Sequence, residues 1–329
     1  MGDFNDTTPS LPLDDHIETE IPALVAMTVY LLFLAITGLA GNLLVIISVA
    51  ISPRLRTTSF AFVFNLSVAD LMVNVLVIPL IIKSFFDYGW PHNPLGCRLV
   101  FYILAFAVGN SLITLTAIAA SRYCFVSRPR RTYNIFCGWK AVILILIYNY
   151  LSGVTFILIT ELANICTIRY LPDIRFCYLD NDLATFWYIN GILFYGALTC
   201  FLLIPLLYCQ TFRTVRQSKH RVWAARVAQQ PTVALYGGRP PVVHPAEIRL
   251  TKMMLLIFIL LLICWTPISV LHFFKHRFSI PKSIHRLCIM LVLTNSSINP
   301  YVYAWFNKNF LHAYKRILHL DQCTRSHSQ

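Results

Sequence analysis

The chain has 329 residues, of which 57% are hydrophobic and only 12% are charged, and its formal net charge at pH 7 is +13. A water-soluble domain of this size needs more polar surface, so the composition excludes an ordinary soluble protein and indicates a lipid bilayer as the solvent. The positive charge then reflects membrane topology and attraction to lipid headgroups, and we expect no nucleic-acid partner.

Seven apolar stretches are long enough to cross a bilayer. A spanning helix needs ~20 mainly apolar residues, because hydrocarbon offers the backbone no hydrogen-bond partner. The predicted spans run over residues 22–51, 59–82, 95–126, 138–160, 184–213, 248–274 and 283–306. The sequence therefore predicts an all-α membrane protein, a seven-transmembrane helix bundle. Its predicted parts are an extracellular tail (1–21), the transmembrane domain (22–306), and a C-terminal amphipathic helix with a cytoplasmic tail (307–329).

Basic residues indicate the orientation of the bundle. Loops rich in Lys and Arg stay cytoplasmic, and most of the 27 Lys and Arg residues fall on one side when the N-terminus lies outside. We therefore expect a multi-pass protein of the plasma membrane with an extracellular N-terminus. Asn5, in the sequence Asn5-Asp6-Thr7, is then a glycosylation site on the outer tail.

Two cytoplasmic segments carry amphipathic patterns. The third cytoplasmic loop, at about 214–247, begins with a basic stretch that either extends the fifth span as an amphipathic helix or forms a solvated charged helix. After the last span, apolar residues recur at helical spacing with Lys315 and Arg316 between them. This pattern predicts a short eighth helix on the membrane surface.

Asp70 is the most informative polar residue inside a span. An ionised side chain in mid-bilayer costs at least ~2.5 kcal/mol, so such a residue is a functional candidate unless it is paired or faces water. Carboxylate, amide and hydroxyl oxygens can hold Na⁺ or a proton. The alternative is a polar cluster that fastens helices without an ion. The other spans offer it five partners: Asn42, Ser111, Asn295, Ser296 and Asn299.

Four prolines lie within the predicted spans, at Pro79, Pro205, Pro267 and Pro300. Each removes a backbone donor and kinks its helix. Four kinks in one bundle favour a bundle that moves.

Five motifs in five different spans carry a resemblance to a known family. They are Asn42 in "GNLLV", Asp70 in "LSVAD", Arg122 in "SRY", Trp265 and Pro267 in "CWTP", and Asn299, Pro300 and Tyr303 in "NPYVY". In this order they resemble the motifs of rhodopsin-like (class A) G-protein-coupled receptors, and the resemblance covers nearly the whole chain. Within that family we expect the nearest relatives in the melatonin-like and moody-like orphan grouping.

The resemblance implies roles for individual residues. The activation switch would comprise Arg122, Tyr123, Tyr208, Glu247, Trp265, Pro267, Asn299, Pro300 and Tyr303. A site for allosteric Na⁺, the only cofactor expected, would comprise Asp70, Ser111, Asn295, Ser296 and Asn299. Cys97 would form a disulfide with the second outer loop, where we choose Cys177 over Cys166.

The residue before Arg122 departs from the family pattern. The family usually has an acid there, but this chain has Ser121. Glu247, twenty residues before Pro267, occupies the position from which the sixth span can form an ion pair with the arginine. We hypothesise that Arg122 and Glu247 form an inactive-state lock, and that the missing acid raises basal activity. Alternatively, Arg122 reaches lipid phosphates and Glu247 is an ordinary acid at a helix start.

Two further departures concern the fourth and fifth spans. Pro205 lies three residues before Tyr208, whereas the family more often places proline eight before it. Tyr148 or Tyr150 is predicted to replace a tryptophan that the family has in mid-span four.

The expected ligand pocket is mostly apolar. Leu104 stands where amine receptors have an aspartate, and Leu293 stands where opsins have the retinal-binding lysine, so neither a biogenic amine nor retinal is expected. The predicted pocket residues are Leu104, Ala105, Val108, Ile192, Trp265, Ile268, Ser269, His272, Ile289 and Leu293.

Basic residues are expected to surround this pocket. They are Arg169, Arg175, Lys275, Arg277, Lys282 and Arg286. An apolar pocket with a basic rim favours a lipid-like or anionic amphiphilic ligand, unless the rim contacts phospholipid headgroups. His272 and His276 could bind a metal, but we favour a role in pocket polarity, and we expect no metal other than Na⁺.

These observations favour a receptor that binds an extracellular ligand and activates a heterotrimeric G protein, with arrestin as a second cytoplasmic partner. One alternative is an uncoupled scavenger receptor of the same fold. Another is an ion- or proton-coupled transporter using Asp70, although no internal repeat supports it. The sequence contains no Gly-x-Ser-x-Gly, His-Glu-x-x-His or phosphate-loop motif, so we expect no enzyme activity.

Overall fold

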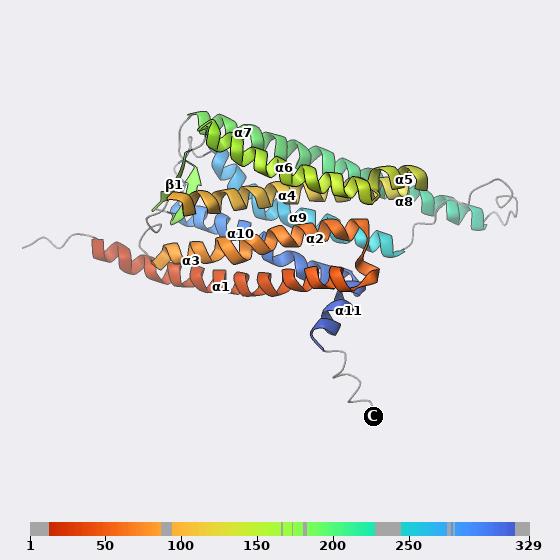
Figure 1. Ribbon diagram of the computed structural model, residues 1–329, viewed down its shortest axis with the longest axis horizontal. Helices are drawn as coiled ribbons and strands as arrows, with labels where there is room; N and C mark the ends of the chain where they lie inside the picture. Colours follow the sequence, from red (N-terminus) through yellow and green to blue (C-terminus); the bar gives the residue numbers. More distant parts are fainter. Residues whose placement is uncertain are drawn as a thin grey trace, which may run out of the picture.

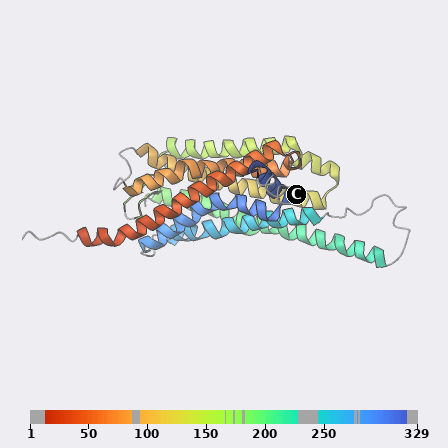
Figure 2. The same cartoon turned by 90° about the horizontal axis from the view of Figure 1, so that it is seen from below.

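The computed structural model describes residues 13–86, 94–165, 167–172, 174–179, 183–227, 245–274, 278 and 280–319. Long helices lie side by side along one axis, with a small β-hairpin at one end of the bundle (Figure 1). Toward the opposite end lie α5, α11 and the last turns of α8, and the turned view shows the same separation (Figure 2). We call these the hairpin end and the α11 end.

The first part of the chain forms four of the spans and two short helical segments between spans. Its elements are α1 (Leu13–Ile51), the 3-10 helix η1 (Pro53–Leu55), α2 (Thr58–Met72), the π-helical turn η2 (Val73–Val77), α3 (Ile78–Phe86), α4 (Pro94–Ser127), α5 (Arg130–Cys137) and α6 (Trp139–Leu162).

The second part begins with the hairpin, in which β1 (Ile168–Leu171) pairs with β2 (Phe176–Leu179) in antiparallel register, Ile168 opposite Leu179. The remaining helices complete the bundle. They are α7 (Leu183–Leu198), the π-helical turn η3 (Thr199–Leu203), α8 (Ile204–Val227), α9 (Pro245–Phe274), α10 (Lys282–Phe306) and α11 (Lys308–Ile317).

Within the described residues, six helical segments are long and apolar enough to cross a membrane, starting with Ile21–Ile51. The more polar α10 is the seventh span, because its 25 residues reach ~37 Å and it packs between α1 and α9. Its polar side chains Asn295, Ser296, Ser297 and Asn299 are buried against other helices and not exposed to lipid. The structure thus has the predicted seven-helix bundle.

Helix α1 starts earlier than the span predicted from residue 22. The first turns, from Leu13, carry Asp14, Asp15, Glu18 and Glu20, and the apolar part begins at Ile21. Asn5, Cys166, Lys275, His276, Arg277 and residues 228–244 lie outside the described residues, so the predictions that concern them remain predictions.

Two of the four predicted proline kinks take the form of π-helical turns. The turn η2 ends two residues before Pro79, and η3 ends two residues before Pro205. A proline ring clashes with the carbonyl four residues earlier, and widening the preceding turn relieves that clash. In the fifth span, the deformation at Thr199–Leu203 therefore includes Cys200, where the family more often has its proline.

Two apolar clusters fill the bundle. The cluster toward the hairpin end includes Leu31, Val100, Phe176 and Leu293, and the other, toward the α11 end, includes Phe60, Tyr208, Tyr303 and Phe310. Burial of this apolar surface fixes how the helices pack. The polar residues described below lie between or beside these clusters.

The predicted eighth helix is α11, which leaves the bundle below α1 (Figure 1). Asn307 caps it by accepting a 3.0 Å hydrogen bond from the backbone N–H of Asn309. Phe310 and Tyr314 on one face are buried, whereas Lys315 and Arg316 are exposed. This amphipathic arrangement matches the helix expected after the last span.

Candidate functional site

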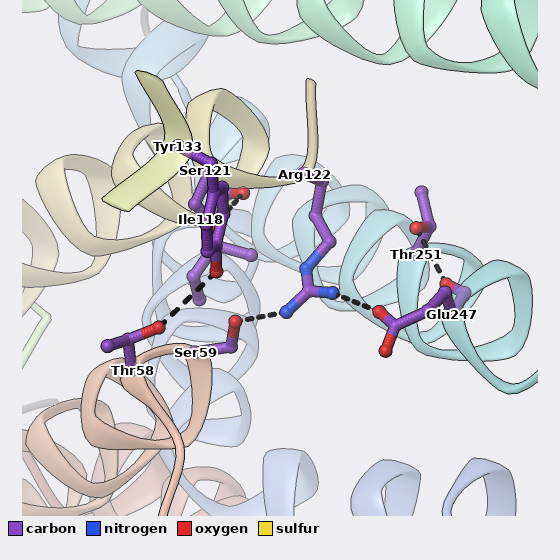
Figure 3. Close-up of polar contacts among 8 residues, drawn as sticks. All are labelled: Thr58, Ser59, Ile118, Ser121, Arg122, Tyr133, Glu247 and Thr251. Atoms are coloured by element: carbon purple, nitrogen blue, oxygen red, sulfur yellow. Dashed lines mark hydrogen bonds and ion pairs between the residues drawn. The ribbon is translucent and has the colours of Figure 1, made fainter. Parts of the chain in front are cut away.

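Arg122 lies in the last turns of α4, close to the α11 end, and is 5% exposed. Its Nη1 donates to Glu247 Oε2 at 2.6 Å, so an ion pair joins α4 to the first turn of α9 (Figure 3). Its Nη2 donates to the hydroxyl of Ser59 at the start of α2. The guanidinium therefore joins three helices, and it points toward protein partners and not toward lipid phosphates.

Ser121 contributes no charge to this contact. It is buried and donates a 2.9 Å hydrogen bond to the carbonyl of Ile118 in the preceding turn. Thr251 likewise bonds within its own helix, to the Glu247 carbonyl at 2.9 Å. Within the described residues, Glu247 is thus the acidic partner of Arg122.

The switch residues on the other helices lie in the core. Tyr208 and Tyr303 are 3% and 0% exposed, and their hydroxyl groups have no hydrogen-bond partner within the described residues. Tyr303 stacks on Phe310 of α11 with ring centroids 5.4 Å apart, and Trp265 packs against the same apolar cluster. Buried polar groups are usually hydrogen-bonded, so these two hydroxyl groups are exceptions within the core.

Asp70 lies at the centre of a buried polar cluster and is 1% exposed. Its Oδ2 accepts a 2.9 Å hydrogen bond from Asn299 Nδ2, and its Oδ1 has no partner within the described residues. Asn42 donates to the Ser296 carbonyl at 2.9 Å. Ser111 is also buried but donates within α4, to Ala107 at 2.8 Å.

Sequence reasoning missed Asn74 as a member of this cluster. Asn74 Nδ2 donates to the carbonyls of Asp70 (2.8 Å) and Ser296 (3.1 Å), and its Oδ1 accepts from Ser297 at 2.8 Å. A side chain on Gly38 would collide with Asn74, so only glycine lets α1 approach here. The available signal was an asparagine in the middle of an apolar run.

A second buried polar cluster joins α2, α4 and α6. Asn110 Oδ1 accepts hydrogen bonds from Asn65 Nδ2 at 2.7 Å and from Asn149 Nδ2, and Thr114 lies beside them. Asn149 is thus the buried residue in mid-span four, where we predicted an aromatic replacement for tryptophan. Tyr148 is 60% exposed, which contradicts that prediction for it, whereas Tyr150 tilts against Phe106 with ring centroids 5.6 Å apart.

The hairpin covers one end of the bundle. A disulfide joins Cys97 at the start of α4 to Cys177 on β2, as predicted, with the two Cα atoms 5.4 Å apart. Tyr178, the next residue on β2, forms a 3.2 Å hydrogen bond with Nδ1 of His272 at the end of α9. Burial raises the pKa of Tyr178, so this hydroxyl stays protonated at neutral pH.

Four of the predicted pocket residues lie in or against the apolar cluster under the hairpin. Ile289 and Leu293 belong to the buried cluster of the hairpin end, and Leu104 and Ile268 pack against it together with Tyr178. Ile192 is 41% exposed on α7 and belongs to neither cluster, so its assignment to the pocket is not supported by its position. Ala105, Val108 and Ser269 are partly buried, and His272 is buried. Trp265 is also partly buried, but it packs against the cluster of the α11 end.

Only some of the basic residues predicted to surround the pocket are exposed at its edge. Arg169 and Lys282 are exposed, but Arg286 is 8% exposed and its charge acts on Tyr170 of β1. Arg175 donates to the Phe85 carbonyl at 3.1 Å and so fixes the hairpin to α3. Arg286 is therefore buried beneath the hairpin and is not part of the rim.

The chain matches a known protein family over most of its length. The model of the family described as "7 transmembrane receptor (rhodopsin family)" matches residues 41–303, which is most of the chain. The chain belongs to this family. It is therefore a multi-pass receptor of the plasma membrane that activates G proteins from the cytoplasmic side, in a family of receptors and not of enzymes.

Individual relatives refine this result. Melatonin receptor type 1A of Ovis aries is 27% identical over 305 residues, which cover 89% of this chain and 77% of the relative. Melatonin receptor type 1C of Gallus gallus is 26% identical over 299 residues, which cover 86% and 79%. The structure of squid rhodopsin matches with a TM-score of 0.77 at 19% identity, covering 91% of this receptor and 86% of that chain, and shows the fold alone. The receptor is thus melatonin-like within class A.

Proposed function

We propose that the receptor has its N-terminus and hairpin end outside the cell and its α11 end in the cytoplasm. A ligand bound under the hairpin would then act on a heterotrimeric G protein at the α11 end. The observation that carries this proposal is the Arg122–Glu247 ion pair, because it joins α4 to α9 at the end that the G protein must contact.

The ion pair is proposed to hold the inactive arrangement. Arg122 is nearly enclosed, with 6% of its side chain exposed, whereas the Glu247 side chain is 31% exposed. A buried charge that loses its partner is strongly disfavoured, so the pair opposes separation of α9 from α4. Ligand-driven movement about Pro267 in α9 would break the pair and free Arg122 and the α9 terminus for the G protein.

The proposed ligand is lipophilic. The cluster under the hairpin is lined by apolar side chains such as Leu104, Ile268 and Leu293, with His272 and Tyr178 as the polar pair above it. The two relatives named above are melatonin receptors by name, which supports a lipophilic ligand. Exposed Arg169 and Lys282 near this end favour a ligand with an anionic group.

Na⁺ is proposed as an allosteric ion at Asp70. The residues fit a hard cation, because Asp70 Oδ1 and Asn299 Oδ1 are buried oxygens without hydrogen-bond partners in the described part of the chain. Ser111, Asn295 and Ser296 are buried on the neighbouring helices. A bound cation would neutralise the carboxylate and favour the arrangement in which α2, α4 and α10 enclose it.

The experiment measures G-protein dissociation in cells without ligand, at matched surface expression. The variants are Glu247→Ala, Arg122→Ala and, as a matched loss of charge, Arg128→Ala, which removes an exposed cation beside the same end of α4. Loss of the ion pair should favour the open state, in which α9 is separated from α4, by about 1 to 2 kcal/mol; this value is already reduced for the exposure of Glu247. Glu247→Ala should therefore raise the G-protein dissociation signal about fivefold or more.

Arg122→Ala should abolish the signal and Arg128→Ala should leave it unchanged. If Glu247→Ala equals the wild type while Arg122→Ala is silent, the lock is refuted and the receptor function stands. Silence of every variant across all G-protein classes would support the uncoupled scavenger instead, and arrestin recruitment would then be measured on the same variants.

A further inference from the structure

Arg122 has a second contact that its family role does not account for. Its Nη2 donates to the hydroxyl of Ser59, which is 3% exposed and lies in the first turn of α2 (Figure 3). Figure 3 shows the guanidinium lying between Ser59 on one side and Glu247 on the other. Two different helices thus hold the two terminal nitrogens of one side chain.

The contact between Arg122 and Ser59 places a positive charge at the start of a helix. The first turn of a helix carries unpaired backbone N–H groups and a partial positive charge, so it repels a guanidinium. Thr57, the N-cap residue of α2, makes no side-chain hydrogen bond to the helix. An oxygen acceptor on Ser59 therefore allows the Arg122 cation to lie against a helix end that would otherwise disfavour it.

The residue next to Arg122 does not supply this acceptor. Ser121 bonds to Ile118 within α4, and Arg122 Nε has no partner within the described residues. A guanidinium is rigid and planar, so contacts at both terminal nitrogens fix its plane, whereas one contact leaves it free to rotate. With only Glu247 as partner, Arg122 would be held at a single point.

We propose that Ser59 is a positioning residue that takes the place of the missing acid beside Arg122. It orients the guanidinium toward Glu247 and adds α2 as the third helix of the lock. The inference rests on the proposed function in one respect, namely that opening of α9 is the step that activates the receptor.

The test compares three substitutions at one position. Ser59→Ala removes the acceptor, Ser59→Thr keeps a hydroxyl group, and Ser59→Asp replaces it with a carboxylate. Opening is measured on the purified receptor as the distance between spin labels carried by unnatural amino acids at Lys140 and Lys252, which are exposed near the α11 ends of α6 and α9. Basal G-protein dissociation is measured in parallel at matched surface expression.

Each variant has a distinct expected result. A hydrogen bond to a charged group is lost in Ser59→Ala, which should raise the open fraction about tenfold or more, while Ser59→Thr should stay near the wild type. Ser59→Asp should lower the open fraction by a similar factor and should partly restore closure in a Glu247→Ala background. In an Arg122→Ala background the three variants should not differ, because the residue that Ser59 positions is absent.

The two readouts keep this inference separate from the proposed function. Label distances that shift as expected without any G-protein signal would refute the proposed function and leave the role of Ser59 intact. Equal distances in Ala, Thr and Asp variants would overturn the inference. So would an effect of Ser59→Ala that persists in the Arg122→Ala background, because it would show a purely structural role in α2.

Discussion

Replacing Ser121 by aspartate would restore the acid that the family usually has before its arginine. Ser121 is 6% exposed, and its hydroxyl group bonds to the Ile118 carbonyl at 2.9 Å. The Nε of Arg122 has no hydrogen-bond partner within the described residues. A carboxylate at this position would lie one residue from a guanidinium with an unused donor, so it should strengthen the closed state.

The size of the effect follows from the contacts that are gained and lost. A hydrogen bond to a charged group contributes ~1.5 to 3 kcal/mol, and losing the Ser121–Ile118 bond removes ~1 kcal/mol. The difference is about 1 kcal/mol in favour of the closed state, which is roughly a fivefold fall in the open fraction.

The assay is basal G-protein dissociation in the Glu247→Ala background, where a raised signal leaves room for a decrease. Ser121→Asn is the matched control, because it has the same shape without the charge. We expect Ser121→Asp to lower the signal about fivefold and Ser121→Asn to change it less than twofold, since only the former adds a charge-assisted bond. Equal signals for the two variants, or a rise with aspartate, would refute this reasoning.

Three further predictions concern the polar groups outside the lock. Replacing choline by Na⁺ in the buffer at constant ionic strength should raise the melting temperature of the wild type but not that of Asp70→Asn. An equal rise in both would exclude Asp70 as the ion site. Asn110→Leu should destabilise the receptor by about 2 to 4 kcal/mol, because two buried amide donors lose their shared acceptor. Asn149→Leu removes one donor and should cost less. Thermal unfolding in detergent that shows the wild-type melting temperature for both variants would contradict a stabilising role of the cluster. Folding raises the pKa of Tyr178 above its ordinary value of 10.0, so the contribution of this residue to stability is complete below pH 10.0 and is lost as the pH rises further. The melting temperature should therefore fall less between about pH 9 and 11 in Tyr178→Phe than in the wild type. Parallel plots of melting temperature against pH for the two proteins would contradict this assignment.

The helices and several contacts between them could be read from the sequence because each rests on a local pattern or a fixed motif spacing. Apolar length marked most of the spans, and the spacing of Glu247, twenty residues before Pro267, placed the glutamate opposite Arg122. Polar residues in apolar runs marked Asp70, but the same signal at Asn74 and Asn149 could not say which helix each would face.

Other features depended on packing that the sequence does not encode locally. The acceptor role of Ser59 arises because α2 begins where α4 ends, and serine at a helix start is common for other reasons. The burial of Arg286 depends on where the hairpin lies over α10, since the residue reads as one more cation at a membrane surface.

The π-helical turn η3 changes how ligand contacts on α7 should be located. A π turn holds one residue more than an α turn, so residues before Thr199 are rotated by about 100° relative to positions counted back from Tyr208 along a regular helix. Ile189 is 9% exposed, whereas Ile192 is 41% exposed. A relative whose fifth span is deformed elsewhere would therefore turn different side chains toward the interior of the bundle at equal alignment positions. If ligand contacts were assigned from such a relative by sequence alignment alone, they would be placed on the wrong face of this helix.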